Sequence, residues 1–334
     1  MGIESVKPRL GFLGLGWIGL QRMAAIVSSG EAEVVALADP VKDLIAKAAE
    51  LAPKAAQTRT LEELLKNEMA GVVIATPSAL HASQTVNVLN RGAAVFCQKP
   101  LGRSLIEVSW AIEAAKAADR LLGVDLSYRF TTAMKHLRRV VQSGDLGDIF
   151  AGKLVFHNAY GPQKPWFYDP QLAGGGCVMD LGIHLVDAAL WILDCSVTHI
   201  DSRLFYRGNR VAGRQNACED YATARLDFAN GAIIELACSW HLHAGRDAVM
   251  EAAFYGTKGA VAMKNKDGSF LDFFAERFNG TSRELLCGPP DDWAGRAAVD
   301  WVRRLRQRNA YDPEIEQMLK VAQVLDAIYE NARP

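Results

Sequence analysis

A glycine-rich turn near the start of the chain constrains its fold more than any other feature. Residues 10–13 form a short apolar run that leads into Gly14-Leu15-Gly16-Trp17-Ile18-Gly19 and a helix-like segment. A second apolar run, 34–38, ends at Asp39, 20 residues after Gly19. A strand, a glycine turn, a helix, a second strand and a terminal acid are the fingerprint of a βαβ unit that binds a dinucleotide.

Each position of this turn has a physical task. Gly14 allows the tight turn, Gly16 lets the backbone approach a pyrophosphate, and Gly19 lets the helix pack close to the strand. Trp17 and Ile18 begin the helix, whose N-terminal N–H groups and partial positive charge favour phosphate.

Asp39 decides which dinucleotide is expected. Its carboxylate can accept hydrogen bonds from a ribose 2′-OH and would repel a 2′-phosphate. The sequence therefore predicts NAD in preference to NADP.

Length, charge and cysteine usage bound the class of protein. At 334 residues the chain is too long for one ordinary core, so two domains are expected. A net charge of −1 argues against a nucleic-acid or membrane surface, and no apolar run reaches the length that spans a bilayer. A basic cluster at 303–308 is interpreted as one solvated helix face. The six cysteines are scattered, which favours reduced thiols in a cytoplasmic protein.

Residues 1–125 are expected to form an α/β domain, a Rossmann-type doubly wound parallel sheet that binds the dinucleotide. Apolar runs alternate there with helix-like stretches, and Thr60 followed by Glu63 is typical of a helix N-terminus. After the first strand, the expected strands are 34–38, 71–75, 93–96 and 121–124, and the expected helices are 41–51, 60–66, 81–90 and 105–118.

Residues 126–334 are expected to form an α+β domain on a large, mostly antiparallel open sheet. Asn230-Gly231 predicts a two-residue hairpin between two of its strands. The expected strands are 149–160, 198–206, 221–228, 232–240, 249–255, 260–263 and 269–274, and the expected helices are 133–142, 178–193 and 313–331. Whether the last helix packs back on the first domain is left open.

Lys99 follows directly after an expected parallel strand, at the edge of the sheet where ligands bind in this architecture. A cation there can contact both the nicotinamide ribose and a substrate hydroxyl. The alternative is an ordinary solvated charge.

Asp180 and His184 stand four residues apart on the expected helix 178–193. At this spacing they share one helix face, so the acid can orient the imidazole for proton transfer. A surface pair, or half of a metal site with no evident third ligand, are the alternatives. Removing a hydride from a secondary alcohol needs a base and a cation for the developing alkoxide. His184 and Lys99 suit these two roles, and no metal is required.

Several further motifs occur together in this chain. They are Ala75-Thr76-Pro77 with His81, Lys99-Pro100, Tyr128-Arg129-Phe130 and the segment 174–187. In this combination, and over nearly its whole length, the chain resembles the Gfo/Idh/MocA family of oxidoreductases.

The resemblance implies a hydride transfer between NAD(P) and a secondary alcohol or carbonyl of a sugar, cyclitol or related polyol. Lys99, Asp180 and His184 would then be catalytic, with His184 as the general base and Asp180 as the orienting group. The C-terminal sheet of family members often mediates assembly, which implies a homodimer or homotetramer. Further cofactor contacts are implied at Ala75, Thr76, Pro77, His81, Gln98, Lys99 and Arg129. Gln98 replaces the glutamate of the family, which keeps the shape of the side chain but removes its charge.

Substrate contacts are expected at Lys99, Asp180 and His184 and at two further positions. Trp166, in the loop 160–169, can stack on the apolar face of a sugar ring, and a packed crossing loop is the alternative. His241 can line the substrate cleft, with His243 on the same side of an expected strand. An edge or interface histidine is the alternative there.

Two other functions stay open on the sequence alone. One is an imine, enone or tetrapyrrole reductase on the same scaffold, in which the lysine–histidine pair matters less. The other is a regulator or assembly subunit that senses NAD(H) without turnover. The intact set of Lys99, Asp180 and His184 argues against the sensor, which has no need of all three.

Overall fold

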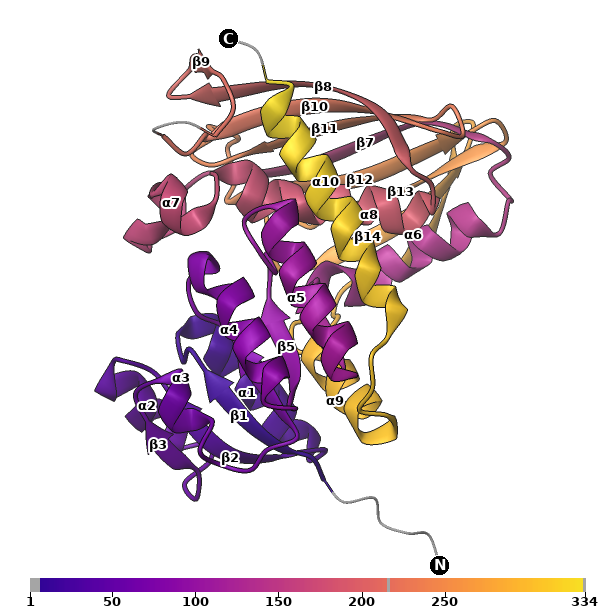
Figure 1. Cartoon of the computed structure of the whole chain (residues 1–334). Helices are drawn as coiled ribbons and strands as arrows, with labels where there is room; N and C mark the ends of the chain where they lie inside the picture. The colour runs from indigo at the N-terminus through magenta and orange to yellow at the C-terminus, as the bar shows by residue number, and fades with distance from the viewer. Residues whose placement is uncertain (1–6, 215–216, 333–334) are drawn as a thin grey trace, which may run out of the picture. The chain divides into compact units, whose positions relative to one another are not determined.

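The computed structural model of the chain (Figure 1) describes residues 7–214 and 217–332. These residues divide into two compact units. The first contains the N-terminal part of the chain up to Ser127 together with Ala294–Met318, and the second contains Tyr128–Trp293 and the chain from Leu319 onward. The assignment of cofactor binding to 1–125 and of substrate binding to 126–334 stays a prediction.

The first unit is built on a six-stranded parallel sheet with the order β3-β2-β1-β4-β5-β6. The order reverses between β1 and β4, so the sheet is doubly wound, as the sequence predicted. β4 is buried at every position and β1 at all but its first residue, which is typical of a sheet covered on both faces. The elements are β1 Arg9–Leu13, α1 Trp17–Ser29, β2 Glu33–Ala38, α2 Lys42–Ala49, β3 Ala56–Thr58, α3 Leu61–Leu64, β4 Gly71–Ile74, α4 Ser78–Asn90, β5 Ala94–Gln98, α5 Leu105–Ala118, β6 Leu122–Asp125, α9 Arg296–Gln307 and η4 Pro313–Glu316.

Helix α9 packs on this sheet although it lies late in the sequence. The Trp301 ring lies 5.7 Å from the Phe96 ring, and a Cβ at Gly71 or Gly123 would come within 2.7 Å of that indole. Gly71 in β4 and Gly123 in β6, the strands on either side of β5, therefore leave room for the Trp301 indole.

The basic cluster on α9 is not a purely solvated face, and in this respect the expectation was wrong. Arg303 and Arg306 donate hydrogen bonds to Glu31 at 2.6 and 2.9 Å. The hydrogen bond from Arg303 is the main reason that the pKa of Glu31 is lowered. Arg304 pairs with Asp312 on the segment that follows α9.

The second unit is built on a nine-stranded sheet with the order β15-β14-β13-β12-β7-β11-β10-β8-β9. β7 and β11 are parallel and the other neighbours are antiparallel, which confirms the predicted mostly antiparallel sheet. The helices α6 and α8 lie along one face of the sheet (Figure 1). The elements are η1 Ser127–Phe130, α6 Thr132–Gln142, β7 Ile149–Asn158, η2 Pro165–Tyr168, α7 Pro170–Ala173, η3 Val178–Gly182, α8 Ile183–Leu193, β8 Val197–Tyr206, β9 Asn209–Val211, β10 Tyr221–Phe228, β11 Ile233–Ser239, β12 Ala248–Gly256, β13 Gly259–Asn265, β14 Phe273–Asn279, β15 Ser282–Cys287 and α10 Gln317–Glu330.

One strand expectation in this unit was wrong. Of the expected strand 269–274 only the last two residues are in a strand, because β14 begins at Phe273 and continues to Asn279. The Ser269 hydroxyl accepts hydrogen bonds from the backbone N–H groups of Leu271 and Asp272 at 3.1 Å each, which closes a turn. Local side-chain bonds of this kind compete with the sheet ladder.

A long apolar stretch runs from Pro170 to Leu193 through α7, η3 and α8, against the expectation that no such length occurs. The most apolar 18-residue window of this 24-residue stretch has a mean hydropathy of 1.6, enough by length and composition to cross a membrane. Within the structure 89% of that window is buried, which is typical of the central helix of a core.

Candidate active site

The glycine turn of the first unit has the geometry that a dinucleotide phosphate requires. Gly14 adopts φ +87°, and a Cβ there would lie 2.5 Å from the carbonyl oxygen of Ala75. A Cβ at Gly19 would lie 2.1 Å from the carbonyl oxygen of Gly14. Gly16, the residue that caps α1 before Trp17, has no heavy atom within 4 Å of the place of a Cβ. The turn is therefore closed at Gly14 and Gly19 and open at Gly16, so it fits a pyrophosphate.

Asp39 lies beside this turn and is 6% exposed. Its Oδ2 accepts a hydrogen bond from the Leu15 N–H at 2.8 Å, and its Oδ1 accepts one from the Val41 N–H at 2.9 Å. The carboxylate thus holds the glycine turn against the end of β2. Because an ionised carboxylate can accept about four hydrogen bonds, capacity for a ribose hydroxyl is left.

His81 ties two loops together at the carboxyl edge of the parallel sheet. Its Nδ1 lies 2.6 Å from the carbonyl oxygen of Pro100, and its Nε2 lies 2.7 Å from the carbonyl oxygen of Thr76. Burial lowers the pKa of His81, against the opposing effect of these two carbonyls. The residue stands in the first turn of α4 and fixes the loop that contains Thr76 and Pro77. Its predicted contact with the cofactor stays a prediction.

Lys99 is half-buried at the end of β5, next to a polar network. The Gln98 Oε1 accepts a hydrogen bond from the Lys99 N–H at 2.9 Å, and the Gln98 Nε2 donates one to Asp125 Oδ2 at 3.0 Å. Asp125 also accepts from Arg22 Nε and is 1% exposed. The backbone of the candidate catalytic lysine is therefore held by an amide that is itself fixed by a buried ion pair.

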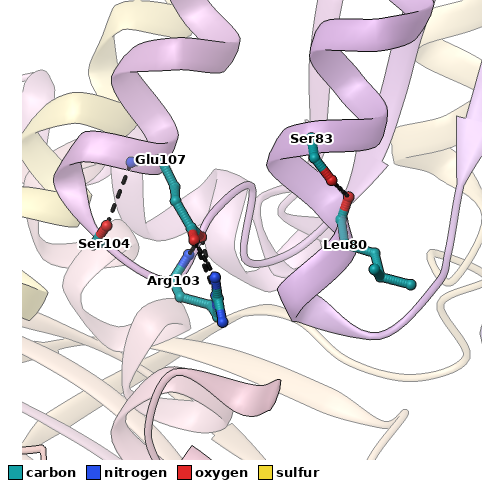
Figure 2. Close-up of polar contacts among 5 residues, drawn as sticks. All are labelled: Leu80, Ser83, Arg103, Ser104 and Glu107. Atoms are coloured by element: carbon teal, nitrogen blue, oxygen red, sulfur yellow. Dashed lines mark hydrogen bonds and ion pairs between the residues drawn. The ribbon is translucent and has the colours of Figure 1, made fainter. Parts of the chain in front are cut away.

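The segment after Lys99-Pro100 is anchored at the start of α5 (Figure 2). The Ser104 hydroxyl caps α5 by accepting a hydrogen bond from the Glu107 N–H at 3.4 Å. Glu107 in turn accepts from the Arg103 backbone N–H at 2.7 Å and forms an ion pair with its guanidinium. On the neighbouring α4, the Ser83 hydroxyl donates to the Leu80 carbonyl oxygen at 3.1 Å (Figure 2).

In the second unit, Asp180 lies on a single π-helical turn that opens directly into α8. Its Oδ2 accepts a hydrogen bond from Trp240 Nε1 at 3.1 Å. The structure thus differs from the uninterrupted α-helix expected over 178–193, and turns of this kind often occur at functional sites.

His184 stands in the first turn of α8 and is 9% exposed. Its ring meets the edge of the Tyr128 ring at 4.7 Å and lies 6.4 Å from the Phe156 ring. The Tyr128 and Phe156 rings also contact each other, with centroids 5.7 Å apart, so the imidazole packs against an aromatic cluster.

Arg129 is anchored within the second unit. Its Nε donates to Asp187 Oδ2 at 2.8 Å, its Nη2 bonds the other carboxylate oxygen, and its guanidinium lies 5.4 Å from the Trp191 ring. A bidentate, buried pair of this kind is geometrically specific. The implied cofactor contact of Arg129 stays a prediction.

Glu219 supports the turn that carries Asp180, and sequence reasoning missed it. The side chain is 2% exposed and accepts hydrogen bonds from the N–H groups of Gly176 and Val178 at 2.9 Å each. The Tyr329 hydroxyl donates a third at 2.8 Å. Burial raises the pKa of Glu219, and these donors act in the opposite direction. The local sequence Cys218-Glu219-Asp220 gives no signal for this role.

The two predicted substrate contacts lie in different surroundings. The Trp166 ring stacks on the Phe167 ring at 3.8 Å, within the short helix η2. His241 lies beyond the end of β11 with φ +58°, so the strand alternation expected for His241 and His243 does not apply. Its Nε2 is 3.5 Å from the Tyr168 hydroxyl. Whether these side chains contact substrate stays a prediction.

Comparisons with known proteins place the chain. The family model described as "Oxidoreductase family, NAD-binding Rossmann fold" matches residues 8–126, and the model of the GFO/IDH/MocA C-terminal domain matches 134–262. The chain belongs to the Gfo/Idh/MocA family. This Gfo/Idh/MocA protein is accordingly an NAD-binding oxidoreductase with a Rossmann fold over residues 8–126.

Relatives of this Gfo/Idh/MocA protein are named for sugars and related compounds. D-Glucoside 3-dehydrogenase of Escherichia coli is 23% identical over 282 residues, which are 78% of this chain and 76% of that protein. The rhizopine catabolism protein MocA of Rhizobium meliloti is 29% identical over 225 residues, 67% of this chain and 68% of that one.

Solved structures show the same fold. Aldose-aldose oxidoreductase from Caulobacter crescentus, complexed with glycerol, superposes with a TM-score of 0.85 at 22% identity, covering 98% of each chain. Levoglucosan dehydrogenase in complex with NADH superposes with a TM-score of 0.82 at 19% identity, covering 98% of this chain and 97% of that one.

Proposed function

We propose that this protein transfers a hydride between NAD and a secondary alcohol or carbonyl of a sugar, cyclitol or related polyol. The observation that carries the proposal is the support given to Asp180 and His184. One is fixed by the Trp240 indole and the other by the Tyr128 ring, on consecutive turns of one helical stretch. Groups positioned in this way lose little freedom when they bind a reacting hydroxyl.

His184 is the general base in this proposal. The residue is 9% exposed, so little water competes for the nitrogen atoms of its ring. In alcohol oxidation it takes the hydroxyl proton, and in carbonyl reduction it returns that proton. Asp180 orients the imidazole or the substrate hydroxyl, while Lys99 stabilises the developing alkoxide with its positive charge.

The nicotinamide ring of NAD, when bound, accepts or gives the hydride. The chain's contribution is to hold the dinucleotide. Gly16 leaves the first N–H groups of α1 open to the pyrophosphate, and Asp39 receives a ribose hydroxyl. The D-glucoside 3-dehydrogenase relative supports a sugar substrate. Assembly into a homodimer or homotetramer through the open sheet, and a cytoplasmic location, belong to the same proposal.

The test is NADH formation when the purified protein meets a panel of aldoses, cyclitols, sugar acids and sugar nucleotides. We expect turnover with NAD and one class of the panel. His184→Ala should lower kcat about 10²–10⁴-fold while the Kd for NADH is unchanged. His199→Ala, at an exposed position of β8, is the matched control and should retain full activity.

Two results would contradict the proposal. Turnover near normal in His184→Ala would refute the assignment of the base. Turnover with NADP alone would refute the role given to Asp39 but not the hydride transfer.

A further inference from the structure

A cavity of about 870 Å³ opens at one end of the large sheet, where β8 and β11 end and β10 begins. Five aromatic side chains line it together with His241; the five are Tyr168, Phe205, Tyr206, Tyr221 and Trp240. Its size falls within the range of cavities that hold small organic ligands, and such sites are mostly apolar with a few polar groups.

The cavity adjoins the candidate catalytic acid. Trp240 lines the cavity, and its Nε1 donates a hydrogen bond to Asp180 Oδ2 at 3.1 Å. The Tyr168 ring packs edge-on against the Trp240 ring at 5.6 Å. Burial and the nearby Asp180 carboxylate both raise the pKa of Tyr168. A ligand that fills the cavity therefore lies next to the residues that hold Asp180.

The walls are fixed by contacts among themselves. The Tyr221 ring stacks on the His157 ring at 5.9 Å and meets the edge of the Phe205 ring at 5.7 Å. Gly161 passes so close to the opposite wall that a Cβ there would lie 2.2 Å from the Tyr168 hydroxyl oxygen and 2.5 Å from His241 Nε2. Rigid aromatic walls bind flat or ring-shaped groups at a small entropic cost.

The charges at the cavity balance. The backbone N–H of Arg207 donates a hydrogen bond to Asp220 Oδ2 at 2.9 Å. The guanidinium of Arg207 lies 5.2 Å from the centroid of the Tyr206 ring. One cation next to one carboxylate is a poor site for a phosphate, which needs several donors or an Arg cluster. A neutral ligand fits these walls better than a nucleotide sugar does.

We propose that the cavity binds the aglycone ring of a neutral glycoside whose sugar ring is oxidised at Asp180 and His184. This inference rests on the proposed function and adds the class of substrate. An aromatic wall can stack on the apolar face of a second sugar ring or on an aromatic aglycone, and the polar rim at His241 and Asp220 meets its hydroxyl groups.

The first experiment measures binding without turnover, by titrating intrinsic tryptophan fluorescence. The probes are cellobiose, phenyl β-D-glucoside, methyl β-D-glucoside and UDP-glucose. We expect cellobiose or phenyl glucoside to bind about tenfold more tightly than methyl glucoside. Tyr206→Ala should remove this preference, and Tyr206→Phe, which keeps the ring, should retain it. Tyr255→Ala changes an exposed tyrosine at the C-terminal end of β12 that does not line the cavity, and it is the matched control.

Equal binding of all glucosides would overturn the proposal, as would a preference that survives Tyr206→Ala. Tightest binding by UDP-glucose would overturn it in favour of a nucleotide sugar. The second experiment compares kcat/KM for the same probes in NADH formation. Selective binding without NADH formation would refute the proposed oxidation and keep the cavity assignment. NADH formation with no preference for a second ring would refute the cavity assignment and keep the proposed oxidation.

Discussion

Gln98 and Asp125, the last residues of two neighbouring parallel strands, are joined by a hydrogen bond from Gln98 Nε2 to Asp125 Oδ2 at 3.0 Å. The amide stands where the family resemblance implies a glutamate. A glutamate at this position would direct a carboxylate at the buried Asp125. In this chain the amide can donate to the carboxylate at the end of the neighbouring strand, which an ionised glutamate cannot do.

The first prediction concerns this pair. Gln98→Glu removes the hydrogen bond and adds a like charge, so we expect the free energy of unfolding to fall by about 1–3 kcal/mol at neutral pH. Urea denaturation measures the change. The double variant Gln98→Glu/Asp125→Asn restores an amide–carboxylate pair and should recover part of the loss. If Gln98→Glu alone is as stable as the parent, the two side chains do not interact as described.

Two glycines of the N-terminal turn should separate stability from cofactor binding. Gly19→Ala places a Cβ 2.1 Å from a backbone oxygen, so we expect a loss of about 1–3 kcal/mol in unfolding free energy. Gly16→Ala meets open space and should cost about 1 kcal/mol or less, but its methyl group intrudes where the pyrophosphate approaches. Titration with NADH should show Kd raised at least about tenfold in Gly16→Ala. Unchanged NADH affinity in that variant would place the phosphates elsewhere.

His81 should make the native state sensitive to mild acid. Its pKa lies below the ordinary value of 6.5 because burial disfavours the charged ring, so the unfolded chain takes up the proton first. Stability is therefore complete above about pH 6.5 and falls as the pH drops below it, by at most about 1.4 kcal/mol per pH unit.

Denaturation of His81→Gln between about pH 5 and pH 7.5 tests this linkage. The variant should start less stable and show a shallower decline. The decline should not vanish, because burial also lowers the pKa of His157. His199→Gln serves as the exposed control, and a parent slope that His81→Gln leaves intact would refute the assignment.

Glu219 should govern the turn that carries Asp180. Glu219→Gln presents an NH₂ group to N–H donors that need an acceptor, so we expect a loss of about 1–3 kcal/mol in unfolding free energy. We also expect kcat to fall more than KM rises, because Asp180 moves with the turn. Glu235→Gln, at an exposed position of β11, is the matched control. A stability loss with unchanged kcat would leave Glu219 a purely structural residue.

The parallel sheet could be predicted from the sequence because its strands are buried on both faces and give continuous apolar runs. The strands 34–38 and 71–75 differ from β2 and β4 by one residue each. The three-residue strands β3 and β9 gave no such signal. The start of β14 was misplaced because the Ser269 turn depends on side-chain hydrogen bonds that periodicity does not reveal.

At the site, the glycine turn could be predicted in detail because steric rules fix the residue at each position. The supports of Lys99 and Asp180 could not, because Asp125 and Trp240 act from segments distant in sequence. Gln98 and Asp125 are paired in register at the ends of the neighbouring strands β5 and β6. That register is the sequence signal from which their contact could have been predicted.

Glu219 and Tyr329 are separated by 110 positions, yet one carboxylate oxygen and one hydroxyl make them a single functional unit. Loss of the Tyr329 hydroxyl removes one of three donors to the buried carboxylate, and loss of the carboxylate leaves that hydroxyl and two backbone N–H groups without their acceptor. Among close relatives of this protein, we therefore expect substitutions at positions 219 and 329 to covary. Such covariation would reveal the residues that support Asp180 from sequences alone.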